Sequence, residues 1–159
     1  MNHRTLTAAL VGGVLALAAG CGSQPSGIEA GPSAPTGVAP GMTLYFLDHD
    51  GNLTAQQRET GRLGTVSETV SVLLTGPGDS DVRTGIDPTP VTRTEVTVSG
   101  ERMSVRVPVA STEVTAGGVD QIVCTALAGH IQAGGSTETR AGIRFTDTAL
   151  EPRTCPVLG

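Results

Sequence analysis

Apolar and polar positions divide the 159-residue chain into three stretches of different character. An apolar run at 6–19 follows a basic start, Asn2-His3-Arg4. At roughly 14 residues, this run has the length of a signal-peptide core and is too short to span a bilayer. Residues 22–41 are rich in Gly, Ser, Pro, Ala and Thr without apolar periodicity, which predicts a flexible tether. From residue 42 onward, apolar positions repeat with the periods of strands and helices, so we expect the folded domain there.

Strand-like patterns occur in five segments of this domain. Residues 43–47 form a continuous apolar run, and a polar turn at 48–52 leads to a more polar strand at 53–62. Valines alternate with polar residues on both sides of Ser99-Gly100-Glu101, which predicts a hairpin with one buried face. The last segment, 139–145, places apolar residues on one face and arginines on the other. The apolar positions of the later strands are Val96, Val98, Met103, Val105, Val107, Val109, Ala141, Ile143 and Phe145.

Two helices are predicted between these strands. Thr65 and Glu68 match a capping box at the start of the first helix, and Gly76-Pro77 supplies its stop. A second helix is expected at 115–128, with Gly129 as its cap. The inward positions are Val66, Val70, Leu73 and Leu74 in the first helix and Val119, Ile122, Val123, Ala126 and Leu127 in the second.

The order strand, strand, helix, hairpin, helix, strand predicts a compact α+β domain. We expect a small mixed sheet with two helices packed on one face, built by residues 42–159 as a single domain. Residues 76–93 are rich in Gly, Pro and Asp and read as a long loop.

Charge and composition narrow the choice of partners. The chain carries a formal net charge of −5, and its ten basic residues are all arginine. An acidic balance without a basic cluster argues against nucleic acid as a partner and against electrostatic docking on a membrane. The three aromatic residues are Tyr45, Phe46 and Phe145, so the core must be built from Val, Leu and Ile.

The small residues before Cys21 indicate which kind of signal peptide the N-terminal apolar run belongs to. Leu17-Ala18-Ala19-Gly20-Cys21 resembles the lipobox of bacterial lipoproteins, in which the cysteine is lipidated and the chain is cut just before it. The resemblance implies a signal peptide at 1–20 and a lipidated Cys21 with its linker at 21–41. The domain would then be anchored to the lipid bilayer on the extracytoplasmic face of the cell membrane. The alternative is a signal peptide cut at an Ala-x-Ala site, which leaves Cys21 as a stray thiol.

Two further cysteines fit an oxidising compartment. If Cys21 carries lipid, Cys124 and Cys155 form a pair, and a disulfide would hold the Pro-flanked C-terminal tail. The alternative is two free buried thiols.

Several segments together resemble the GerMN domain of sporulation and spore-germination proteins, which also occurs in actinobacterial lipoproteins. The resemblance covers roughly residues 42–145 and implies a non-enzymatic envelope module without a cofactor, in a fold similar to ring-building motifs. The chain departs from the family by having one copy of the domain and by its cysteine pair. The matching segments are Leu44-Tyr45-Phe46-Leu47, Gly51-Asn52-Leu53, Arg58, Leu73-Leu74-Thr75-Gly76-Pro77, Gly85-Ile86 with Pro88 or Pro90, and Gln121-Ile122-Val123-Cys124-Thr125.

The turn after the first strand has the spacing of a calcium loop. Asp48, Asp50, Asn52 and Glu59 fall at positions 1, 3, 5 and 12 of such a loop. Leu53 stands where the loop requires glycine, and Asp-Gly between two strands is also a routine hairpin turn. The hairpin turn is the favoured interpretation, with calcium as the alternative.

The long loop is the first candidate for contact with a partner. Asp79, Asp81 and Asp87 surround Arg83 there, and long loops on a rigid scaffold often carry binding, although a solvated loop explains the same pattern. The leading hypothesis is a scaffold that binds an envelope protein. The alternatives are a binder of a small cell-wall or lipid component and, less favoured because no Gly-x-Ser-x-Gly elbow is present, a secreted hydrolase. Arg106, Arg140 and Arg144 are expected to point outward from their strands, where a soluble face is the simplest interpretation.

Overall fold

The structure, a computed structural model, describes residues 41–158. The predicted leader, Cys21 and the tether up to residue 40 lie outside the described residues. The α+β class expected from the sequence is confirmed. In chain order the elements are β1 (Gly41–Leu47), β2 (Leu53–Glu59), α1 (Val66–Leu73), β3 (Glu95–Ser99), β4 (Arg102–Arg106), the 3-10 turn η1 (Ser111–Glu113), α2 (Ala116–Gln132), β5 (Arg140–Arg144) and β6 (Ala149–Arg153).

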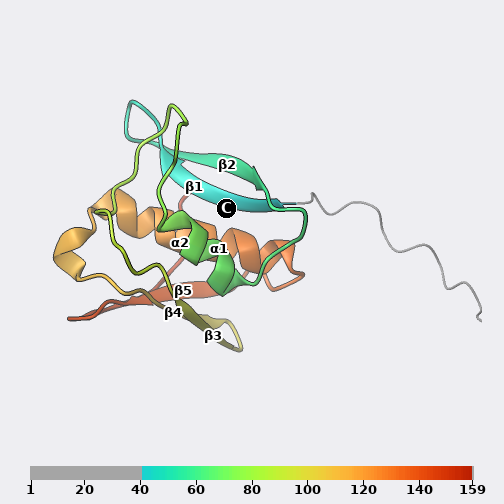
Figure 1. The fold of residues 1–159 in the computed structure, drawn as a ribbon. Coiled ribbons are helices and arrows are strands. Elements are labelled where there is room, and N and C mark those ends of the chain that lie inside the picture. Colours follow the sequence, from blue (N-terminus) through green and yellow to red (C-terminus); the bar gives the residue numbers. More distant parts are fainter. Residues whose placement is uncertain (1–40, 159) are drawn as a thin grey trace, which may run out of the picture. The chain divides into compact units, whose positions relative to one another are not determined.

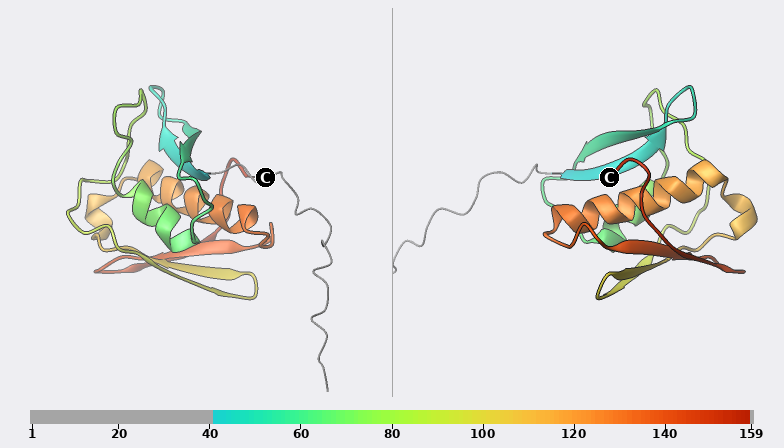
Figure 2. Two further views of the ribbon diagram at one scale, coloured as in Figure 1. Left: turned by 45° about the vertical axis from the view of Figure 1, so that its right-hand side comes forward. Right: turned by 180° about the vertical axis from the view of Figure 1, so that it is seen from behind.

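The strands form two sheets, whereas the sequence pattern predicts a single small one. β1 and β2 form an antiparallel pair, and the other four strands form a mixed sheet in the order β3-β4-β5-β6, in which β4 and β5 run parallel. Figures 1 and 2 show both helices between the β1–β2 pair and the four-stranded sheet. Helix α2 packs on β1 on one side and on β5 on the other.

The core lies between these layers. Along β4 and β5, the residues that face the helices are buried, and the arginines that alternate with them are exposed. Val98 is the exception among the predicted inward residues, with 45% of its surface exposed. It belongs to the edge strand β3, which the helices cover only in part (Figure 1). The largest fully buried apolar side chains are Phe46, Leu44, Leu73, Met103, Ile122 and Ile143.

The capping box of α1 is confirmed in full. The backbone N–H of Glu68 donates to Thr65 Oγ1 over 3.1 Å, and the backbone N–H of Thr65 donates to Glu68 Oε2 over 2.8 Å. Gly76, two residues beyond the C-cap Leu74, adopts a φ of +83°, which glycine adopts without strain. The two ends of α1 are therefore set by the residues that predict them.

Helix α2 is longer than the sequence predicts. The sequence pattern predicts Gly129 as its cap, but Gly129 lies inside the helix and is buried against Thr69 of α1. The helix continues to Gln132, and Gly134 supplies the left-handed turn that ends it, with a φ of +86°. A glycine alone does not stop a helix when the packing around it favours continuation.

Two polar residues of α2 are buried because the helix lies between two sheets. Thr125 Oγ1 accepts the backbone N–H of Tyr45 over 2.9 Å, and Gln121 Nε2 donates to the carbonyl of Tyr45 over 3.1 Å. Gln121 Oε1 also accepts the backbone N–H of Gly85 over 2.6 Å. These side chains satisfy the backbone groups of Tyr45 in β1 that face away from β2 and one backbone N–H of the loop at Gly85.

Strand β6 was not expected from the sequence. Pro152 lies within it and cannot donate to a ladder, which explains the weak strand signal and suits an edge position. The register with β5 shifts between Ala141 and Ile143, so the edge is irregular. Beyond β6, Cys155 is bonded to Cys124 of α2, which is compatible with the predicted pair.

Candidate interaction surfaces

Loop 76–93, here called the acidic loop, is fixed at its base to the end of β1. The backbone of Arg83 pairs with Leu47 in both directions, at 2.7 and 2.9 Å. The guanidinium of Arg83 donates to the carbonyls of Asp48 (2.9 Å) and His49 in the β1–β2 turn. Arg83 therefore attaches the loop to the neighbouring turn. Within residues 41–158 it forms no ion pair with an aspartate.

A second attachment joins the acidic loop to the start of α2. Gly85 and Gly118 pack directly against each other: a Cβ built on Gly118 would lie 2.2 Å from the carbonyl oxygen of Gly85. The backbone N–H of Thr115 donates to the same carbonyl over 2.8 Å, and Ile86 pairs with Val114. The two glycines allow a close approach of the main chains, which leaves no room for a side chain.

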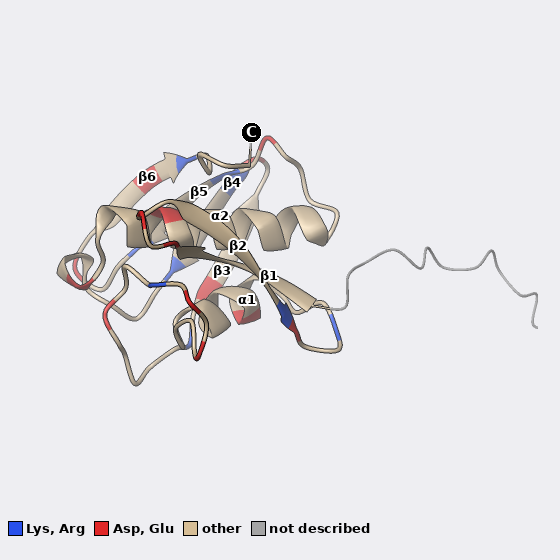
Figure 3. Cartoon of the chain, turned by 90° about the horizontal axis from the view of Figure 1, so that it is seen from above, with Lys and Arg blue, Asp and Glu red and all other residues tan. Residues whose placement is uncertain are grey.

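The tip of the acidic loop is exposed above this base. Asp79 and Asp81 lie at the tip, and Asp87 is exposed where the loop passes η1. The loop lies beside the β1–β2 turn, which carries Asp48 and Asp50 (Figure 1). Figure 3 shows acidic positions in red in these loops, and the turn and the tip together form an acidic end of the domain.

Of the four residues of the calcium alternative, Asp48, Asp50 and Asn52 lie together in the β1–β2 turn, and Glu59 lies apart from them. Asp48 Oδ1 accepts the backbone N–H groups of Asn52 (2.8 Å) and Asp50 (2.9 Å), and these hydrogen bonds, chiefly the one from Asn52, lower the pKa of Asp48. Glu59 pairs with Gly41 at the opposite end of the hairpin, six residues along the ladder from Leu53. Six residues of strand span about 20 Å. The carboxylate of Asp48 therefore holds a turn, and residues 41–158 contain no cluster of three or more metal-binding side chains.

A second surface, which we call the arginine face, is the outer side of the four-stranded sheet. The register of the parallel strands places Arg102 beside Arg140 and Arg106 beside Arg144. All four side chains belong to exposed residues. Arg106 pairs with Glu95 at 3.2 Å on neighbouring β3. The strand pattern of the sequence predicts three of these outward arginines but not Arg102, which directly follows the hairpin turn.

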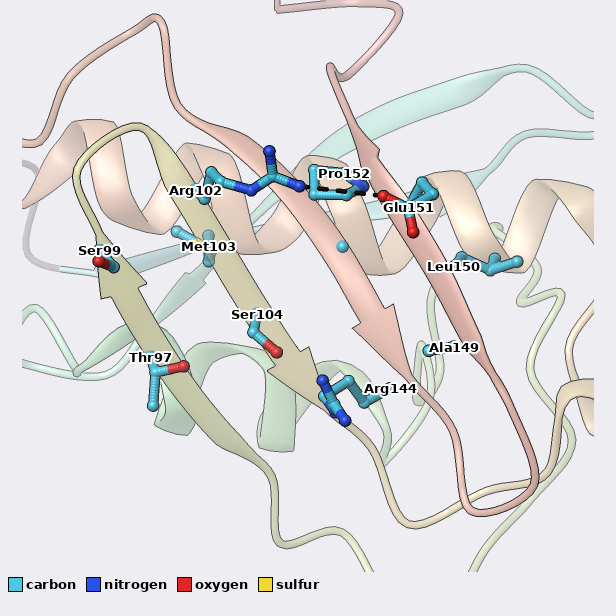
Figure 4. A pocket seen from close by; sticks show the side chains of 11 residues that line it. Thr97, Ser99, Arg102, Met103, Ser104, Arg144, Ala149, Leu150, Glu151 and Pro152 are labelled. Carbon is cyan, nitrogen blue, oxygen red and sulfur yellow. Dashed lines mark ion pairs between the residues drawn. The ribbon is translucent and has the colours of Figure 1, made fainter.

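A hollow lies on the arginine face between the two arginine pairs. Its volume is about 380 Å³, and Figure 4 shows the side chains of Thr97, Ser99, Ser104, Arg102 and Arg144 around it. The hollow exists because Gly142 has no side chain at its centre. A Cβ on Gly142 would lie 2.9 Å from the carbonyl oxygen of Leu150 and 3.3 Å from the ring of Pro152.

A larger recess of about 690 Å³ lies beside α1 and the segment that leads into β3. Arg62 and Glu68 line it and form an ion pair at 2.9 Å. The hydrogen bond from Arg62 lowers the pKa of Glu68 to about 2. Both groups are therefore engaged with each other and with the helix cap.

The two histidines of residues 41–158 lie in different parts of the fold. His49 is exposed in the β1–β2 turn, and His130 contacts the hydroxyl of Thr139 at 3.1 Å. Neither histidine forms an ion pair with a carboxylate within the described part of the chain. Residues 41–158 contain no helix that is long and apolar enough to cross a bilayer.

Comparison of the chain with protein-family models, with curated proteins and with solved structures finds no match. The resemblance to the GerMN domain therefore stays a prediction.

Proposed function

We propose that this chain is a lipid-anchored module on the extracytoplasmic face of the cell membrane, which binds an envelope protein through the acidic loop and catalyses no reaction. Cys21 would carry the lipid, and residues 22–40 would tether the domain to the bilayer, because Gly41 already belongs to β1. The disulfide between Cys124 and Cys155 supports an oxidising compartment. The GerMN-like motifs support a place in the cell envelope.

The construction of the acidic loop is the observation that carries this proposal. Arg83 and Gly85 fix its base to the β1–β2 turn and to α2, while Asp79 and Asp81 stay exposed at the tip. A loop that is already ordered loses less conformational entropy when a partner binds it. Carboxylates at its tip favour a basic surface on that partner and speed its approach.

The test is an affinity pull-down of the tagged lipoprotein from lightly crosslinked membranes, with partners identified by mass spectrometry. The loop variant carries Asp79→Asn and Asp81→Asn. Its matched control carries Glu59→Gln and Glu138→Gln, which remove two exposed carboxylates elsewhere on the domain. A Cys21→Ala variant tests the anchor separately.

We expect one stoichiometric partner, retained by the control and lost from the loop variant. Loss from Cys21→Ala as well would support the anchor. If both carboxylate variants retain the partner equally, the acidic loop is not the binding surface. If no specific partner is recovered from the unaltered lipoprotein, the proposal of a protein-binding module is wrong.

A further inference from the structure

The arginine face concentrates positive charge in a chain that is acidic as a whole. The net charge is −5, yet four of the ten arginines point outward from two neighbouring strands. Strands in a sheet lie about 4.8 Å apart, and like charges placed side by side across a ladder destabilise it. The folded state therefore bears a repulsion that an anionic ligand would relieve.

The carboxylates of the same face balance only part of this charge. Glu95 pairs with Arg106 at 3.2 Å, and Glu151 approaches Arg102 at 3.9 Å. Arg140 and Arg144 form no ion pair with any residue from 41 to 158. Two exposed guanidiniums, one at each end of the face, are thus free to bind an anion in a bidentate manner.

The spacing of the charges favours a chain-like ligand. Arg102 and Arg140 form one row across the sheet, and Arg106 and Arg144 form the other, four residues further along the strands. Four residues of strand span about 13 Å. A single small anion reaches one row, whereas a polymer with charged groups at intervals reaches both.

The surface between the two rows has the chemistry of a sugar site. Hydroxyl groups of Thr97, Ser99 and Ser104 line the hollow together with the apolar ring of Pro152 (Figure 4). A sugar offers the matching groups, which are hydroxyls for hydrogen bonds and C–H faces for apolar contact. The volume of about 380 Å³ lies within the usual range for small-molecule sites, about 300–1,000 Å³.

Other occupants fit this face less well. Protein interfaces are usually centred on buried aromatic or apolar anchors, and membrane-surface binding uses apolar side chains among basic ones. The outward positions of the four strands include no Phe, Tyr or Trp. Three large apolar residues are exposed within 41–158, namely Val91, Val98 and Val157. None of them occupies an outward position of the four strands.

We propose that the arginine face binds a phosphate-bearing saccharide polymer, with phosphates at the two arginine rows and a sugar unit over the Gly142 hollow. Phosphate suits a pair of neighbouring guanidiniums because it offers several oxygens for bidentate contacts. The site lies on the other side of the helices from the tip of the acidic loop (Figure 1), and it goes beyond the protein-binding function proposed above.

The test measures binding of the full-length chain, purified in detergent, to three forms of one polymer: phosphorylated dextran, carboxymethyl dextran and neutral dextran. The site variant carries Arg140→Gln and Arg144→Gln. The control carries Arg58→Gln and Arg153→Gln, two arginines outside this face. We expect phosphorylated dextran to bind most tightly and the site variant to lose about tenfold or more in affinity. The control should stay within about twofold, and salt should weaken binding through screening.

Three results would overturn the proposal: equal losses in the site variant and the control, equal binding of neutral dextran, or a preference for anionic over neutral lipid vesicles that exceeds the preference for phosphorylated over neutral dextran. The site variant should keep or raise the melting temperature, because it removes like-charge neighbours, so lost binding cannot be attributed to unfolding. The Asp79→Asn, Asp81→Asn variant should bind phosphorylated dextran like the unaltered chain. Failure here therefore leaves the protein-binding proposal standing, and failure of the pull-down leaves this one standing.

Discussion

The tip of the acidic loop and the arginine face lie on opposite sides of the helical layer (Figure 1), and the two surfaces are assembled in different ways. The loop is one continuous segment whose shape depends on a few attachments at its base, chiefly Arg83 and the contact between Gly85 and Gly118. The arginine face is assembled from separate strands, and its shape depends on the register of β4 with β5 and of β5 with β6. We therefore expect that each surface can be disrupted while the other stays intact.

The largest effect is expected from removing the disulfide. Cys124→Ala with Cys155→Ala opens a link across 31 residues, which should lower the free energy of unfolding by roughly 3–4 kcal/mol on the chain-entropy estimate. The loss should be uneven, because Cys155 lies two residues beyond the end of β6 and holds the edge of the arginine face. Urea unfolding measures the total, and hydrogen exchange should show faster exchange in β6 than before.

The acidic loop serves as the internal control for this variant. Its attachments to β1 and to the start of α2 do not involve the disulfide, so exchange at Arg83 and Gly85 should change little under native conditions. Equal loss of protection in the loop and in β6 would show that the two surfaces are not independent.

The second-largest effect is expected from a substitution that displaces the acidic loop. Gly118→Ala places a methyl group 2.2 Å from the carbonyl oxygen of Gly85, so the loop must move away from α2. We expect a loss of about 2–3 kcal/mol in unfolding free energy, within the range for overpacked sites. Exchange at Gly85 and Ile86 should rise while β6 is unaffected, as measured by hydrogen exchange and urea unfolding.

Gly129→Ala is the matched control, since it is the same change in the same helix. There the added methyl group meets Thr69 at an ordinary 3.6 Å. Alanine is the better helix former, so stability should rise by about 0.5–1 kcal/mol. If both substitutions have the same sign, the close Gly85–Gly118 contact does not limit the structure.

The different origins of the two surfaces also explain how much could be predicted from the sequence. Local signals were reliable: the capping box of Thr65 and Glu68, the Gly100 turn and the alternation along β4 and β5 all appear as expected. The acidic loop was recognisable because its residues are contiguous. The attachment of the loop through Arg83 cannot be recognised in the sequence, because the Arg83 guanidinium bonds to main-chain carbonyls of another segment.

The sequence does not reveal which distant segments pair with each other in the fold. Alternation identifies a strand but not its sheet, so the division into two sheets was missed. The same limit applies to the arginine face, since only the parallel pairing of β4 with β5 brings Arg102 next to Arg140. Burial of Gln121 and Thr125 follows from a second sheet over α2, which no helical period shows. β6 was missed because Pro152 weakens its pattern.

A smaller effect is expected on the arginine face from Gly142→Ala. The new methyl group would lie 2.9 Å from the carbonyl oxygen of Leu150, so β6 must shift and the hollow must fill. We expect a loss of about 1–2 kcal/mol in unfolding free energy, measured by urea unfolding. Affinity for phosphorylated dextran should fall although all four arginines remain.

Ser104→Ala is the control for this change, because it lies beside Gly142 on β4 and removes one hydroxyl without displacing a strand. It should weaken sugar binding slightly and leave stability nearly unchanged. If Gly142→Ala binds phosphorylated dextran as tightly as the unaltered chain, the charges alone suffice and the hollow takes no part in binding.

The smallest expected effect concerns low pH, which acts on the stability of the fold and on the charge of the two surfaces through different residues. Acid removes charge from carboxylates but not from guanidiniums, so low pH should weaken the acidic end and spare the arginine face. Glu68, however, belongs to neither surface. The hydrogen bond from Arg62 and those of the helix cap lower its pKa from 4.5 to about 2. Because the folded state has the lower pKa, its stabilising effect is present above pH 4.5 and is lost as the pH falls through about 2.

Glu68→Gln should therefore lower the melting temperature slightly at pH 7 and not at all near pH 2, with the difference disappearing between about pH 4.5 and 2. Melting curves at half-unit pH steps measure this difference. A gap between the two proteins that persists to pH 2 would mean that Glu68 acts through packing rather than charge.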